Sequence, residues 1–273
     1  MSLSLKKIAY GAVLAAAASL PAATVASAAD LAAPEPMVAE AISSFDIAFG
    51  FKATSDYLVR GISQTNGDPA LQGYAELQAF DWVYAGVWAS NVSFGGAQDP
   101  SAEVDYYGGV RHSFGPVTLD AGYVWVDFTG EDKGSRTLAY GKVYGVVKYA
   151  VTESFDIGGN VYYGSDYINL GAEITHATAF AKYKFTPFAA NPDIGAYISG
   201  SFSHMWTSKN FVPDYSYWDA GAALTYKGLT LDVRYNDSNL SKRECGLEIG
   251  HRNACGDRYL VTLAFDTSIN KLK

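Results

Sequence analysis

Two cysteines, Cys245 and Cys255, are the residues whose type and spacing point most directly to covalent chemistry. An even, closely spaced pair in an exported chain predicts a disulfide formed in an oxidising compartment. The alternative is a zinc site, but His251 is the only histidine between the two cysteines, and zinc needs more ligands than that. We therefore expect a disulfide that closes a short loop near the C-terminal end.

Nucleophilic catalysis is the second chemistry that the residue types allow. Ser165 or Ser203 could pair with His176 as in an outer-membrane lipid hydrolase, where a histidine base activates the serine. No Gly-x-Ser-x-Gly motif is present to place such a serine on a sharp turn. We expect no enzyme, and we interpret the four histidines as surface or rim side chains: His112, His176, His204 and His251.

A calcium site is the third chemistry to consider, because carboxylates lie close together at Asp99, Glu103 and Asp105 and again at Glu131 and Asp132. None of them belongs to the spaced Asp-x-Asp-x-Asp-Gly pattern of a calcium loop. We interpret them as solvated loop charges. The sequence predicts neither a metal nor a cofactor.

The N-terminal segment 1–28 has the features of a signal peptide that is removed on export. Lys6 and Lys7 precede an apolar run over 8–20, and the small residues at 26–28 fit a cleavage site. Without this leader the chain carries 18 Lys+Arg against 28 Asp+Glu, a net charge of −10. Such a balance argues against a nucleic-acid partner, which needs a basic face.

The segment 29–44 contains prolines and alanines without a strand pattern, and we expect a flexible periplasmic lead-in. Beyond it no run of about 18 apolar residues occurs, so the sequence predicts no membrane-spanning helix. A membrane-embedded chain without such a helix must be a closed β-barrel, in which every backbone group pairs between strands.

From residue 45 onward, apolar and polar side chains alternate as they do in half-buried strands. Leu229 and Leu231, for example, alternate with Thr230 and Asp232. One segment, 82–91, is apolar on both faces, so its orientation stays open. The twelve expected strands are 45–53, 71–80, 82–91, 103–113, 117–127, 138–149, 155–163, 175–185, 194–203, 216–226, 229–236 and 258–266.

Long and short connections alternate between these segments. The long ones are 54–70, 92–102, 128–137, 164–174, 204–215 and 237–257. Long external loops that alternate with short periplasmic turns are typical of outer-membrane barrels. We therefore expect an all-β fold, a transmembrane antiparallel up-and-down β-barrel of twelve strands over 45–273. The alternative is a Tyr-rich soluble β-sandwich, because a composition of 14% aromatic and 18% charged residues also permits that fold.

Aromatic residues gather at the ends of the expected strands. In a membrane barrel they would form the two interfacial girdles, although aromatics also favour strands in general. The residues concerned are Tyr57, Phe80, Trp82, Phe114, Trp125, Tyr149, Phe155, Phe185, Trp206, Trp218 and Tyr226.

One motif in the first long connection carries a family resemblance. It comprises Ser55, Asp56, Tyr57, Arg60, Gly61, Ser63 and Gln64, and a later stretch runs from Glu103 to Gly109. With these motifs the chain resembles the TorF family of porin-like proteins of proteobacteria. The resemblance covers most of the mature chain and implies an outer-membrane barrel without catalytic residues. One departure is that residues 266–273 follow the last aromatic residue, Phe265, whereas such barrels commonly end on an aromatic.

The inward faces of the expected strands carry charges of both signs. We expect the following residues to line a pore: Asp46, Lys52, Glu76, Asp105, Arg111, Asp120, Lys142, Lys148, Asp156, Lys182, Lys184, Asp232, Arg234, Arg258 and Asp266. An isolated buried charge costs several kcal/mol, so these groups must be hydrated or paired. Barrels of about eight strands are filled by side chains and those of about 16 strands are open. The expected number of twelve strands therefore does not show whether the lumen is filled or open.

The sequence therefore predicts a bacterial outer-membrane porin for passive diffusion of small hydrophilic solutes, exported by its signal peptide. Its expected partners are small polar solutes and membrane lipid, with lipopolysaccharide in the outer leaflet. The alternative is a plugged structural or adhesive barrel that acts through its external loops.

Overall fold

The computed structural model describes residues 45–94, 99–130, 137–188, 190–208 and 213–272. The expected signal peptide, 1–28, and lead-in, 29–44, lie outside the described residues, as do Glu131 and Asp132. Within the described ranges, no helix has the length and apolar character needed to cross a bilayer.

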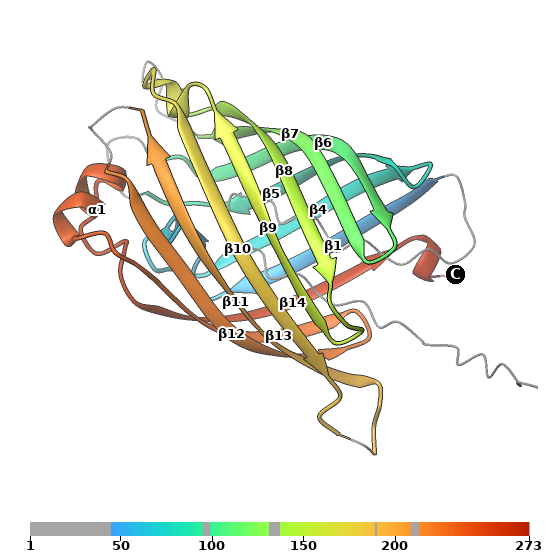
Figure 1. Cartoon of the computed structure of the whole chain (residues 1–273). Coiled ribbons are helices and arrows are strands. Elements are labelled where there is room, and N and C mark those ends of the chain that lie inside the picture. Colours follow the sequence, from blue (N-terminus) through green and yellow to red (C-terminus); the bar gives the residue numbers. More distant parts are fainter. Residues whose placement is uncertain (1–44, 95–98, 131–136, 189, 209–212, 273) are drawn as a thin grey trace, which may run out of the picture.

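Twelve antiparallel strands form one closed barrel, which confirms the expected fold (Figure 1). β1 closes the barrel because it pairs with β14 on one edge and with β4 on the other: Lys52 lies opposite both Ala264 and Gln72. The strands are β1 Phe45–Thr54, β4 Ala70–Ala79, β5 Val83–Asn91, β6 Ala102–Phe114, β7 Val117–Thr129, β8 Tyr140–Ala150, β9 Phe155–Gly164, β10 Ile174–Phe185, β11 Ile194–Thr207, β12 Tyr215–Tyr226, β13 Leu229–Ser238 and β14 Arg258–Ser268.

The two ends of the barrel differ in the length of their connections. One end, here called the turn end, carries short links such as 115–116 and 227–228 together with the start of β1 and the end of β14. The other, the loop end, carries longer links, two of which contain short helices, η1 Tyr167–Asn169 and α1 Lys242–Ile249. A third short helix, η2 Asn270–Leu272, follows β14 at the turn end.

Several strands continue one to four residues beyond their expected ends, among them β11 and β14. β11 extends to Thr207 because Met205 remains paired with Tyr215 of β12. β14 extends to Ser268, which pairs with Ala48 of β1, so the last strand continues past its final aromatic residue.

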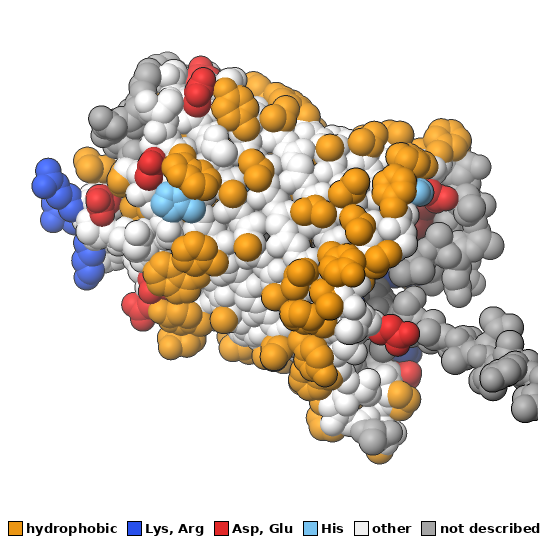
Figure 2. Space-filling model, viewed as in Figure 1, with side chains coloured by type: hydrophobic (Ala, Val, Ile, Leu, Met, Phe, Trp, Pro, Cys, Tyr) orange, Lys and Arg blue, Asp and Glu red, His pale blue; other side chains and the backbone are white. Residues whose placement is uncertain are grey.

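The outer wall of the barrel is apolar. Across the strands that the structure describes, outward positions carry no Lys, Arg or Glu, and their two aspartates, Asp127 and Asp237, lie at the loop end. Large side chains are exposed near both strand ends, such as Trp125 at the loop end and Phe114 and Tyr149 at the turn end. Figure 2 shows apolar side chains gathered towards both ends of the barrel face that it displays.

The inner wall contains tyrosines that lie over glycines of a neighbouring strand. A Cβ atom on Gly86 would lie 2.5 Å from Cζ of Tyr107, and one on Gly122 would lie 2.5 Å from the hydroxyl of Tyr144. A larger residue at either glycine would collide with the ring, so these glycines make room for aromatic groups inside the barrel. β5, whose orientation the sequence left open, points Tyr84 and Trp88 inward.

Candidate functional site

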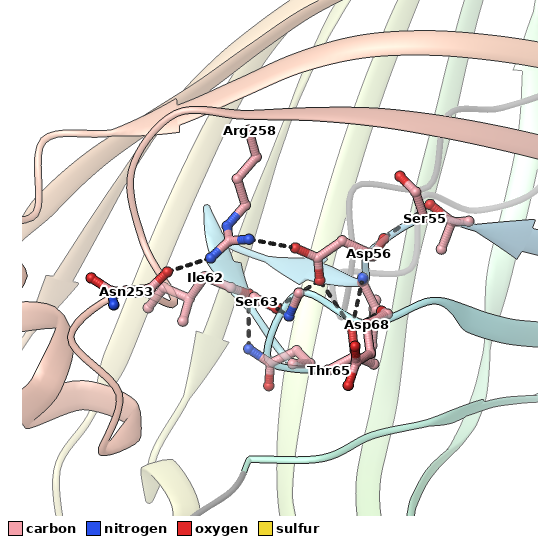
Figure 3. Close-up of polar contacts among 12 residues, drawn as sticks. Ser55, Asp56, Ile62, Ser63, Thr65, Asp68, Asn253 and Arg258 are labelled. Carbon is pink, nitrogen blue, oxygen red and sulfur yellow. Dashed lines mark hydrogen bonds and ion pairs between the residues drawn. The ribbon is translucent and has the colours of Figure 1, made fainter.

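The connection between β1 and β4 folds back into the barrel at the loop end as a small hairpin (Figure 3). Its strands, β2 Leu58–Val59 and β3 Ile62–Ser63, are joined by Arg60 and Gly61. Both turn residues have positive φ, 49° and 76°, as tight two-residue hairpin turns require. We call residues 55–65, which include the family motif, the mouth hairpin.

The mouth hairpin is buried, whereas the sequence predicted a simple external loop over 54–70. Tyr57 exposes 2% of its surface and Ile62 exposes 4%, and Arg60 and Gln64 are also buried. The inward fold could not be predicted from alternation, because strands of two residues have no detectable period.

Asp56 is the polar centre of the mouth hairpin. Its Oδ1 accepts hydrogen bonds from the hydroxyl of Ser63 at 2.6 Å and lies 2.9 Å from that of Thr65. Its Oδ2 accepts a hydrogen bond from Nη1 of Arg258, at the start of β14, at 3.0 Å. The carboxylate therefore folds the hairpin onto itself and fixes it to the barrel wall (Figure 3).

Tyr57 anchors the hairpin to a second part of the wall, formed by β5 and β6. Its hydroxyl donates a hydrogen bond to Oε2 of Glu103 on β6 at 2.8 Å, and its ring centre lies 5.5 Å from that of Trp88 on β5. Burial and the neighbouring Glu103 raise the pKa of Tyr57 well above its ordinary value. The phenol therefore stays protonated and remains a donor to the carboxylate.

The tip of the hairpin reaches across the mouth. Nη2 of Arg60 donates to the hydroxyl of Tyr167, in the connection between β9 and β10, at 3.0 Å. The hydroxyl of Tyr215 on β12 donates to the carbonyl of Arg60 at 3.1 Å. A Cβ on Gly61 would lie 3.0 Å from Cβ of Tyr217. The mouth hairpin thus contacts β5, β6, β12 and β14 and spans the lumen at the loop end.

The connection between β13 and β14, residues 239–257, covers the hairpin from outside, and we call it the strap. The expected disulfide between Cys245 and Cys255 is present in it. The sequence predicted a loop here, but α1 begins with a capping box in which Ser241 and Glu244 exchange hydrogen bonds. That Ser-x-x-Glu pattern is the sequence signal that could have found the helix.

Below the hairpin, the inner wall of β4–β8 holds a buried ion-pair network. Arg111 donates to Oε1 of Glu76 at 3.1 Å and to Oδ2 of Asp120 at 2.7 Å. The hydroxyl of Tyr84 donates to Asp120 at 2.5 Å and lies 2.5 Å from the hydroxyl of Tyr144. The charges are therefore compensated by partners on the wall rather than left isolated.

Two further networks occupy the other side of the wall. Arg234 on β13 pairs with Asp219 on β12 and with Asp232, the latter at 3.1 Å. Lys184 on β10 lies 3.0 Å and Lys148 on β8 lies 3.8 Å from Oδ2 of Asp156. Inward charges of opposite sign thus meet at three places on the inner wall, on β4–β7, on β8–β10 and on β12–β13.

The structure places the predicted pore-lining residues on the inner wall; that they line an open pore stays a prediction. Lys182 lies under the ring of Tyr197, with Nζ 4.1 Å from its centre. Glu103 and Asp105 were interpreted as solvated loop charges, which is wrong, because they are 1% and 0% exposed on β6. Among the predicted pore-lining residues, the buried ones are Glu76, Asp105, Arg111, Asp120, Lys142, Asp156, Lys182, Asp232 and Arg234, and the half-buried ones are Asp46, Lys52, Lys148, Lys184, Arg258 and Asp266.

The serines and histidine considered for hydrolysis have other neighbours. His176 is not a rim residue but is fully buried on β10, where its ring stacks on Tyr162 at 4.7 Å. The hydroxyl of Ser203 lies 2.8 Å from that of Thr178, and Ser165 is exposed. Among the described residues, no group of three or more His, Cys, Asp or Glu side chains could hold a metal ion.

One family model matches the chain over residues 38–265, and the family is described as a bacterial protein of unknown function, Gcw_chp. No curated protein matches the chain.

Several solved structures are similar to the barrel at low sequence identity. The NanC porin is 10% identical with a TM-score of 0.48, and the match covers 81% of this chain and 98% of that one. An outer membrane channel from Pseudomonas putida is 10% identical with a TM-score of 0.46, covering 84% and 97%. LpxR from Salmonella typhimurium is 8% identical with a TM-score of 0.43, covering 80% and 99%. The barrel of this chain is established by its own strand pairing.

Proposed function

The chain belongs to the Gcw_chp family of bacterial proteins, and we propose that it is an outer-membrane channel for small hydrophilic solutes. In the present conformation the mouth hairpin closes this channel at the loop end. The barrel is exported by the signal peptide expected over 1–28, and the resemblance to the TorF family of porin-like proteins points the same way.

The outer wall supports a membrane location. A bilayer tolerates a strand only if its backbone is fully paired and its outward side chains are apolar. Both conditions hold here, since the barrel is closed and outward charges are confined to Asp127 and Asp237 at the loop end. The turn end, with the short links, the start of β1 and the end of β14, then belongs to the periplasmic side. The loop end faces outward into the lipopolysaccharide leaflet.

The inner wall supports passage of polar solutes. It carries charges of both signs and tyrosine hydroxyls on most strands, which are groups that water and polar solutes can contact. A barrel that needed only to be filled would do so more stably with apolar side chains than with buried ion pairs.

The observation that carries the proposal is that the barrel is complete without the mouth hairpin. β1 and β4 pair directly along their whole length, from Phe45 opposite Ala79 to Thr54 opposite Ala70. The hairpin strands pair only with each other, apart from a bridge between Ile62 and Cys255. Removing the hairpin from the mouth therefore breaks no strand pairing of the wall, as a gate requires.

The experiment is a liposome swelling assay with neutral sugars of increasing size. It compares the wild-type barrel with a variant in which residues 56–64 are replaced by a short Gly-Ser linker. We expect faster sugar entry through the variant, because the mouth is then open. Equal, background-level swelling by both folded proteins would contradict the channel.

The second candidate is a plugged structural barrel that acts through its external loops. The observation that favours it is the extent of the internal ion pairs, among them Arg111 with Glu76 and Arg234 with Asp232. If these networks fill the lumen, removing the hairpin leaves the barrel impermeable, and the same assay therefore separates the two candidates.

A further inference from the structure

The strap is bound to the mouth hairpin along one edge. The backbone N–H of Ser63 donates to the carbonyl of Ala254 at 2.8 Å, and Ile62 forms an isolated β-bridge with Cys255. The β3 edge of the hairpin is thus paired with the chain segment next to the disulfide.

Apolar packing reinforces this edge. Ile62 belongs to a buried cluster that also contains Cys245, Ala254, Met205 and Tyr217. One half of the disulfide, Cys245, is fully buried in this cluster, while Cys255 is half-buried. The disulfide therefore lies within the packing that holds the hairpin.

One guanidinium joins the two segments. Arg258 donates from Nη1 to Oδ2 of Asp56 in the hairpin at 3.0 Å and from Nη2 to the carbonyl of Asn253 in the strap. Figure 3 shows Arg258 lying between these two acceptors. Movement of the strap therefore disturbs the ion pair that fixes Asp56.

From these contacts we infer that the strap is a latch that keeps the mouth hairpin in the lumen and that the Cys245–Cys255 disulfide sets its strength. The inference rests on the proposed function, since it concerns how the closed mouth opens. A disulfide restricts the conformations of the segment that it closes, here 245–255, and so keeps Asn253 and Ala254 in position for the hairpin.

A dithiol reductant releases this latch. Its thiolate attacks the sulfur of Cys255, the less buried of the two cysteines, and expels the thiolate of Cys245, which takes up a proton. The second thiol of the reductant then displaces Cys255, which is also protonated. Two electrons and two protons pass to the protein, and the reductant leaves as its own disulfide.

The test is hydrogen exchange of the amides of the mouth hairpin, measured by mass spectrometry on the full folded chain with and without dithiothreitol. We expect exchange over residues 58–64 to become at least about tenfold faster on reduction, because the hairpin opens locally more often. Exchange over β7, which lies five strands from β14 around the barrel, should stay unchanged. Unchanged exchange in the hairpin after complete reduction overturns the latch.

A variant and a second measurement allow the latch to be tested separately from the proposed channel. The double variant Cys245→Ser/Cys255→Ser should exchange rapidly in the hairpin with or without dithiothreitol. Conductance in a planar bilayer should rise on reduction of the wild type. If the hairpin-lacking variant conducts but reduction changes neither conductance nor exchange, the latch fails and the channel stands. If hairpin exchange speeds up on reduction although no variant conducts, the latch stands and the channel fails.

Discussion

Asp56 and Arg258 are 202 positions apart in the sequence, and their side chains form an ion pair at the mouth of the barrel, with Nη1 3.0 Å from Oδ2. One belongs to a segment folded into the lumen and the other to the wall. Asp56 also accepts a hydrogen bond from the hydroxyl of Ser63 within the hairpin. The contact with Arg258 therefore holds the folded hairpin against the wall in the closed state.

The first prediction concerns this pair. Arg258→Gln leaves the buried carboxylate of Asp56 without its cation, and we expect the closed hairpin to lose about 1–3 kcal/mol of stability. Hydrogen exchange of residues 58–64 measures the loss. The matched control is Arg252→Gln, in the exposed part of the strap, which should change exchange little. Equal effects of the two substitutions would contradict a specific role for Arg258.

The second prediction concerns Tyr57. Tyr57→Phe removes the donor to buried Glu103, so the hairpin should open more often and conductance should show brief openings that the wild type lacks. The expected cost is about 1–3 kcal/mol, because a buried carboxylate loses a partner. The control is Tyr106→Phe, on the outer face of β6, the strand that carries Glu103, and it should have no such effect.

The third prediction is the pH dependence of hairpin closure. The pKa of Tyr57 is raised in the folded state. Its contribution to the stability of the closed hairpin is therefore complete below the ordinary tyrosine value of 10.0 and is lost as pH rises above it. The difference in hairpin exchange between wild type and Tyr57→Phe should therefore be constant near neutral pH and shrink in strong alkali. A difference that disappears below pH 7 would show that another group controls closure.

The fourth prediction concerns the internal ion pairs. Arg111→Met leaves Glu76 and Asp120 facing each other without a cation and should lower barrel stability by about 3–5 kcal/mol. The control, Lys184→Met, removes a partly exposed lysine and should cost at most about 1 kcal/mol. Urea unfolding in detergent micelles measures both. Similar stability of the two variants would mean that the Arg111 network is hydrated rather than buried.

The fifth prediction tests the membrane location of the outer wall. Val87→Arg places a charge in the middle of β5 on the outer face and should destabilise the barrel in lipid by about 2–4 kcal/mol. Ala53→Arg, on the outer face at the loop end of β1, should cost only about 0–1 kcal/mol. Refolding into lipid vesicles compares the two. A larger cost at Ala53 than at Val87 would contradict the proposed depth.

The barrel itself was predictable because alternation is a local signal. The segment 216–226 was expected as a strand and forms β12, Tyr215–Tyr226, since its outward side chains from Trp218 to Tyr226 are apolar and its inward ones are small, polar or aromatic. The direction of most inward charges followed from the same period of two, as with Lys142 between Gly141 and Val143.

The site could be predicted only in part, because its contacts are not local. The resemblance singled out Asp56 and Tyr57, but no pattern in one sequence connects them to Arg258 and Glu103. Glu103 and Asp105 were misinterpreted as loop charges because they lie near the edge of an expected loop, although their spacing of two residues already placed both on one face of β6. The disulfide was predictable from cysteine count, whereas its packing on Ile62 was not.

The most direct measurement of the central claim is single-channel conductance of the refolded barrel, with and without residues 56–64, in a planar bilayer under a salt gradient. The account predicts steady conductance steps from the hairpin-lacking variant and few or none from the oxidised wild type. The reversal potential of the variant would then show which sign of wall charge dominates. Silence from a hairpin-lacking variant that is folded and inserted would contradict the account, because the lumen would then be closed by its own wall.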